Sequence, residues 1–169
     1  MDSQTNSFRE LSERKKVTKS DLRARLYLYN QSLIVSSVAE IAEYGPVTAM
    51  PLTTSDQAIG QAVCSHLVRF VPELPNNLRD QKSKDWQAFT ASGAKSVKAF
   101  RAGLVMVSIE TMKNGIFLSA QPYAFEGPSL YAGSELSLAA DHCYIGAAVR
   151  RVLKAAAVLV DHRLFEETA

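Results

Sequence analysis

Two stretches of similar sequence, residues 55–70 (SDQAIGQAVCSHLVRF) and residues 141–156 (DHCYIGAAVRRVLKAA), decide the fold class. From Ile59, the residues at i, i+3, i+4, i+7, i+8 and i+11 form a stripe that is apolar except for His66. The second stretch repeats this template from Ile145. A residue that favours helix N-caps, serine in one case and aspartate in the other, stands first in each stretch. Both stretches are therefore predicted to be amphipathic helices packed on a sheet.

The similarity of these stretches extends to their surroundings. Each predicted helix follows a hairpin and a strand, and a glycine occupies the same place in both first turns, Gly60 and Gly146. Glycine within a helix costs about 1 kcal/mol relative to alanine, so these positions predict a close backbone approach, either to a strand or to each other. Two interpretations stay open: an internal duplication of residues 22–70 and 104–160, or chance similarity of two amphipathic helices.

The more distinct of the two predicted hairpins lies between residues 105 and 121. Apolar and polar residues alternate before Asn114-Gly115, which is a favoured pair for a two-residue type I′ turn. The pairs expected from this turn are Lys113 with Ile116, Thr111 with Leu118 and Ile109 with Ala120. The other predicted elements are a hairpin over residues 26–38 with its turn at Asn30-Gln31, strands over 47–52 and 135–139, and a helical stretch over 85–101 divided at Ser92-Gly93.

These elements define one α/β domain of the α+β type, with a mainly antiparallel sheet built from two hairpin–strand–helix halves and helices packed on it. The domain is expected to span residues 22–169. Residues 1–25 carry seven Lys or Arg against four Asp or Glu, among many small polar residues. We therefore expect residues 1–21 to be a basic, disordered arm. The alternative is an arm that attracts nucleic acid and makes the protein a nucleic-acid-binding regulator.

Length and composition are those of an ordinary globular domain. The chain has 169 residues, of which 47% are hydrophobic and 21% charged, and its net charge is +2. The apolar stretch at residues 26–39 is interrupted by polar residues, so no membrane-spanning segment is predicted. The polar start of the chain does not resemble a secretory signal, so a cytoplasmic protein is expected. The two cysteines, Cys64 and Cys143, are then expected to be reduced.

No motif for catalysis or phosphate binding is present: there is no phosphate-binding glycine loop, no nucleophile elbow and no His-Glu-x-x-His pattern. Cys64, His66, His142 and Cys143 could in principle form a Cys2His2 zinc site. However, Cys64 and His66 diverge on a helix, and His66 fits a hydrogen-bonded core histidine better. We therefore predict no catalytic residue, no metal and no cofactor. An enzyme with an unrecognised site stays an alternative.

Aromatic residues in the loop before the last predicted strand suggest protein binding instead. Tyr123, Phe125 and Tyr131 surround Gly127-Pro128, where a core role is difficult to arrange. Exposed aromatic residues commonly anchor a protein partner. The alternative is that these side chains cover one end of the sheet.

Four segments, together with the order of hairpin, strand and helix, resemble the immunity proteins of bacterial contact-dependent growth inhibition systems. The segments are residues 95–100 (KSVKAF), 105–109 (VMVSI), 115–118 (GIFL) and 145–150 (IGAAVR). The similarity covers residues 22–157. Two departures are Ser119, where that family often has a proline, and the basic N-terminal region.

The resemblance implies a compact cytoplasmic protein, not an enzyme, that binds and blocks the C-terminal toxin domain delivered by a neighbouring cell. Such toxins are commonly nucleases, and a basic nuclease would be attracted by acidic residues. Either acidic residues form a local patch here, or binding relies on strand pairing and aromatic residues. We expect the second hairpin and the loop after it to carry the contact. The residues expected to bind the partner are Glu110, Tyr123, Phe125, Glu126, Tyr131 and Glu135.

Overall fold

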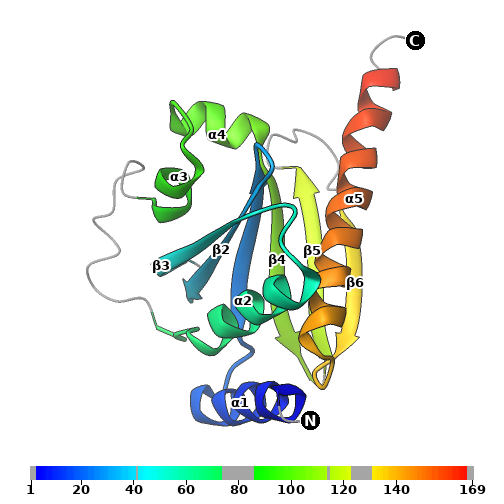
Figure 1. The fold of residues 1–169 in the computed structure, drawn as a ribbon. Helices are drawn as coiled ribbons and strands as arrows, with labels where there is room; N and C mark the ends of the chain where they lie inside the picture. Colours follow the sequence, from blue (N-terminus) through cyan, green and yellow to red (C-terminus); the bar gives the residue numbers. More distant parts are fainter. Residues whose placement is uncertain (1–2, 41, 74–85, 114, 123–130, 167–169) are drawn as a thin grey trace.

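A six-stranded antiparallel sheet forms the centre of the molecule, with the strand order β3-β2-β1-β4-β5-β6 (Figure 1). The computed structural model describes residues 3–40, 42–73, 86–113, 115–122 and 131–166, and side chains between residues 8 and 158 of these. The strands are β1 (Arg23–Tyr29), β2 (Ser32–Ala39), β3 (Ala42–Pro51), β4 (Val105–Met112), β5 (Gly115–Pro122) and β6 (Ala132–Ser137). The helices are α1 (Ser3–Thr18), α2 (Asp56–Val68), α3 (Gln87–Ser92), α4 (Val97–Gly103) and α5 (His142–Glu166). The predicted α+β class is confirmed.

The alternation of side chains along the strands divides the sheet into two faces. Ala24 and Leu26 of β1 point into the main core, which α2 and α5 cover (Figure 1). Tyr27 and Tyr29 point to the opposite face, where α3 and α4 pack over β1–β3. Among the described residues, no helix is long and apolar enough to cross a membrane.

Helices α2 and α5 begin where the sequence predicts. Ser55 Oγ accepts a hydrogen bond from the Ala58 N–H at the start of α2, and Asp141 Oδ1 accepts one from the Tyr144 N–H at the start of α5. These caps satisfy backbone donors that a helix start leaves without a partner within the helix.

The two helices meet through their glycines. A Cβ added at Gly60 would lie 1.9 Å from the carbonyl oxygen of His142, and one added at Gly146 would lie 2.0 Å from that of Asp56. The predicted close approach is confirmed, but its partner is neither a strand nor the other glycine; it is the first turn of the other helix. The contacts are reciprocal, because Gly60 and Gly146 lie 86 residues apart, and so do Asp56 and His142. An internal duplication would produce such a pair of contacts.

The second hairpin departs from its predicted register. Thr111 pairs with Ile116 and Ile109 with Leu118, so the turn lies one residue earlier and every pair shifts by two. The residue entering the turn, Lys113, has a φ of 48°. A shift of two leaves each side chain on its expected face, because side chains alternate with a period of two. The first hairpin turns at Asn30-Gln31, as predicted.

The N-terminal segment is a folded helix rather than the disordered arm expected from its composition. Helix α1 lies across one end of the sheet (Figure 1). Its Leu11 is only 1% exposed and belongs to the main core. Arg14 donates a 2.7 Å hydrogen bond to the carbonyl of Phe70, and Lys15 lies 2.8 Å from Asp21. Because the segment is mostly polar, its composition does not reveal that Leu11 is buried or that Arg14 binds a residue far away in the sequence.

Candidate partner-binding face of the sheet

The sheet face opposite α2 and α5 has a covered half and an open half. Over β1 and β2, the side chains of Tyr27 and Ile34 are buried beneath α3 and α4. Trp86 and Phe100 form the cover, with ring centroids 5.7 and 6.0 Å from that of Tyr27. Over β4–β6 the corresponding side chains keep solvent exposure. The open half is therefore the candidate binding surface.

Strand register places four side chains in a line across this open half. Arg23 of β1 pairs with Glu110 of β4, Glu110 with Phe117 of β5, and Phe117 with Glu135 of β6. We call these four residues the open row. Arg23, Glu110 and Phe117 are half-buried, whereas Glu135 is exposed.

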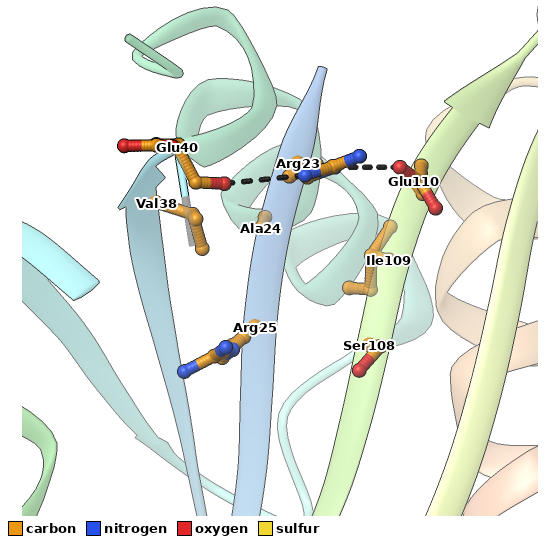
Figure 2. A pocket seen from close by; sticks show the side chains of 8 residues that line it. All are labelled: Arg23, Ala24, Arg25, Val38, Glu40, Ser108, Ile109 and Glu110. Atoms are coloured by element: carbon orange, nitrogen blue, oxygen red, sulfur yellow. Dashed lines mark hydrogen bonds and ion pairs between the residues drawn. The ribbon is translucent and has the colours of Figure 1, made fainter. Parts of the chain in front are cut away.

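An ion pair holds the β1 end of the open row. Arg23 Nε lies 2.5 Å from Glu110 Oε1, and Arg23 Nη1 donates to the carbonyl of Glu40 at 3.3 Å (Figure 2). These residues, with Arg25 and Ser108, line a cavity of about 200 Å³. Because both charges are partly exposed, the pair contributes about 1 kcal/mol or less to stability. Its main effect is to orient the Glu110 carboxylate and offset its charge.

The β6 end of the open row is a groove with an unpaired carboxylate. The residues that line it are Met112, Lys113, Gly115, Phe117, Glu135, Leu136 and Ser137. Within the described part of the chain, no ion pair or hydrogen bond engages the Glu135 side chain. This end therefore combines apolar surface with a carboxylate that has no partner among the described residues, and Lys113 belongs to the same lining.

A notch beside the groove is bounded by two aromatic rings. A Cβ added at Gly133 would lie 3.7 Å from both Phe117 Cζ and Tyr131 Cε2, so the two rings flank this glycine. The Tyr131 side chain is 57% exposed. Tyrosine is enriched among the residues that contribute most of the binding energy of protein interfaces.

The structure thus brings together three of the residues expected to bind a partner, Glu110, Tyr131 and Glu135, on one sheet face. The other three, Tyr123, Phe125 and Glu126, lie outside the described residues. Sequence reasoning missed Arg23 and Phe117. Alternation in the two hairpins could have placed both on this face, but the shifted register would have set Phe117 opposite Met112 rather than Glu110.

His66 is a core histidine held by hydrogen bonds. Its Nδ1 lies 2.7 Å from Ser37 Oγ and its Nε2 lies 2.9 Å from Thr48 Oγ1, so the ring links β2 and β3 to α2. Burial, together with the positive charge of Arg69, lowers the pKa of His66 to about 4. The ring is therefore neutral near pH 7, and both nitrogens are engaged.

The four residues of the conceivable zinc site do not converge. Cys64 is buried on α2, and burial raises the pKa of its thiol to about 12. Cys143 is exposed near the start of α5, next to His142. Within the described residues, no three His, Cys, Asp or Glu side chains lie close enough together to hold a metal ion. The zinc hypothesis therefore gains no support.

The fold and this face define an α+β protein whose antiparallel sheet has one helix-covered face and one half-open face. No family model matches the sequence, and no curated protein matches it. Solved structures that share the fold include two with a TM-score of 0.61.

The first is a protein of unknown function from Neisseria meningitidis, with 20% sequence identity over 82% of this chain and 96% of that chain. The second is a chain of the CdiA-CT/CdiI toxin and immunity complex from Yersinia pseudotuberculosis, with 16% identity over 79% of this chain and 96% of that chain. At these identities the likeness shows a shared fold.

Proposed function

We propose that this protein is an immunity protein that binds the toxin domain of a contact-dependent growth inhibition system and neutralises it by covering its active site. The observation that carries the proposal is the shared fold with a chain of a toxin and immunity complex. The sequence resemblance to the same class of immunity protein agrees with it. In this proposal the protein acts in the cytoplasm, by binding rather than catalysis, and the toxin is a nuclease.

The open half of the sheet is the proposed contact surface. It offers an exposed tyrosine, Tyr131, and two carboxylates, Glu110 and Glu135, on a rigid sheet. Rigid aromatic anchors dominate many protein interfaces, and carboxylates speed the approach of a basic partner. The proposal also includes Tyr123, Phe125 and Glu126, which lie outside the described residues.

Growth rescue tests the function. Under the proposal a toxin domain is encoded next to this gene. That domain is expressed inside bacteria with and without this protein, and growth is followed. We expect the toxin alone to stop growth and co-expression to restore it. Unrestored growth with both proteins present would contradict the proposal.

Titration calorimetry with the purified toxin domain tests the surface. Tyr131→Ala and the triple variant Tyr123→Ala, Phe125→Ala, Glu126→Lys should each weaken binding, by about five- to thirtyfold per lost anchor of about 1–2 kcal/mol. Tyr144→Ala is the control, because Tyr144 is 64% exposed on α5, across the sheet from the proposed surface. Equal affinities for all variants would move the contact elsewhere while leaving the function intact.

A further inference from the structure

The two halves of the sheet carry equivalent cross-strand rows of side chains, but helices cover only one of the two rows. The equivalent rows are Tyr27, Ile34 and Ala49 in the first half and Glu110, Phe117 and Glu135 in the second. Matching positions differ by 83 residues in the hairpins and by 86 in the third strand, the same offset as in the helices. The first row lies under α3 and α4, whereas the second stays open.

The covered row shows which kinds of side chain pack on this face of the sheet. Phe100 of α4 is fully buried against Tyr27 and Ile34. Trp86 Nε1 donates a 2.7 Å hydrogen bond to the Glu43 carboxylate at the sheet edge. The cover therefore combines an apolar side chain over the strands with an N–H donor to a carboxylate on the edge strand.

The open row has the complementary parts for a cover of the same kind, but with more negative charge. Phe117 occupies the place of Ile34, and Glu135 on the edge strand lies next to it without a partner among the described residues. Met112, 50% exposed, adds apolar surface at the same end. A carboxylate beside an aromatic ring suits a cationic side chain, which gains an ion pair and a cation–π contact together.

We propose that the Phe117–Glu135 end of the open row binds a basic segment of the partner protein. An arginine of that segment lies over the Phe117 ring and donates to Glu135, and an apolar neighbour in the segment packs on Met112. Arginine fits better than lysine, because its planar guanidinium both stacks on a ring and donates two parallel hydrogen bonds to a carboxylate. The proposal rests on the proposed function for the identity of the partner, but not for the chemistry of the site.

A peptide titration tests the chemistry without the toxin. The probes are the blocked tripeptides acetyl-Leu-Arg-Leu-amide and acetyl-Leu-citrulline-Leu-amide, which differ in charge and little in shape. Two-dimensional NMR of the labelled protein should show millimolar binding of the arginine peptide, with shifts at Phe117, Glu135 and Met112. Affinity should fall about three- to tenfold for the citrulline peptide and for Glu135→Gln, as expected for a partly exposed ion pair with a cation–π contact.

Glu13→Gln is the matched control, because Glu13 is an exposed carboxylate on α1, at 60% side-chain exposure. It should leave the titration unchanged. Equal binding of both peptides, or shifts confined to other surfaces, would overturn the proposal. Shifts of the same signals with protein concentration alone would show a second copy on the row and would overturn it too.

The toxin domain separates this inference from the proposed function. If the protein rescues growth but Glu135→Gln and Phe117→Ala leave toxin affinity unchanged, the inference fails and the function stands. If the peptide titration succeeds but no toxin is neutralised, the function fails and the cationic site stands. Loss of toxin binding in both variants, with unchanged thermal stability, would support both.

Discussion

His66 shows at the scale of one residue how a polar group is kept in the core. The ring lies in the main core at 0% exposure, and its two nitrogens bond to Ser37 and Thr48. Neutral imidazole satisfies both partners, whereas an imidazolium there would be a buried charge next to Arg69. The histidine therefore couples stability to pH.

We expect the free energy of unfolding to fall as the pH is lowered from about 6.5 toward about 4. The unfolded chain takes up a proton on His66 below its ordinary pKa of 6.5, whereas the folded ring stays neutral down to about 4. Stability is therefore fully present above pH 6.5, and up to about 3 kcal/mol is lost across the window. Urea unfolding at several pH values measures this loss. His66→Gln, which keeps a hydrogen-bonding side chain, should show a smaller slope; an equal slope would assign the effect to other groups.

Gly146 and Gly60 allow helices α2 and α5 to touch. Gly146→Ala would place a Cβ 2.0 Å from the Asp56 carbonyl oxygen, which is backbone and cannot rotate away. We expect a loss of about 2 kcal/mol in urea unfolding, because overpacking outweighs the gain in helix propensity. Gly133→Ala is the control, since its Cβ meets only ordinary contacts at 3.7 Å, and it should change stability by less than about 0.5 kcal/mol. Similar values for both variants would rule out the close helix contact.

At the scale of elements, substitutions in α1 test whether the N-terminal region is a folded helix or a disordered arm. Leu11 lies in the main core, while Val17 on the same helix is 73% exposed. Leu11→Ala should lower the free energy of unfolding by about 2–4 kcal/mol, and Val17→Ala by less than about 0.5 kcal/mol. Chemical denaturation of the two variants makes the comparison. An unchanged free energy of unfolding for Leu11→Ala would contradict the folded helix and favour the disordered arm that the composition suggests.

The elements that could be predicted are those determined by residues close together in the sequence. The apolar stripe from Ile59, the cap at Ser55 and the split at Gly93, which has a φ of 67°, all depend on residues within a few positions. The second hairpin was placed on the correct face but in the wrong register. Its sequence holds the favoured Asn-Gly pair, yet Lys113 adopts the left-handed conformation at the turn. Side-chain alternation fixes the face, whereas turn preference alone did not fix the pairing.

At the scale of the whole molecule, the remaining features depend on contacts between distant segments. Arg23 and Glu110 meet because β1 pairs with β4, 87 residues away, at the centre of the sheet. The partner of Gly146 is Asp56, in the other half. No local pattern states which strands are neighbours. The candidate site could therefore be predicted as a set of acidic and aromatic residues, but not as the ordered row that the sheet assembles.

The distribution of charge over the whole molecule offers a test that distinguishes an immunity protein from a nucleic-acid-binding regulator. Arg14 and Lys15 are engaged within the fold, and the exposed Arg9 pairs with Glu13 on the surface of α1. Lys16 and Lys19 are the other exposed cations of the described N-terminal region. Deleting residues 1–20 would remove Leu11 from the core, so charge reversal is the sharper test. Lys16→Glu with Lys19→Glu takes the net charge from +2 to about −2 and leaves the open row untouched.

We expect this double variant to neutralise the toxin fully in the growth assay and to bind a basic toxin domain at least as fast as the unaltered protein, because association is steered by charge of opposite sign. Stopped-flow mixing at low and high salt measures the rate. A nucleic-acid-binding regulator would behave in the opposite way, because each lost phosphate contact weakens binding and flattens its salt dependence. Loss of growth rescue by a folded double variant would thus favour the regulator over the immunity protein.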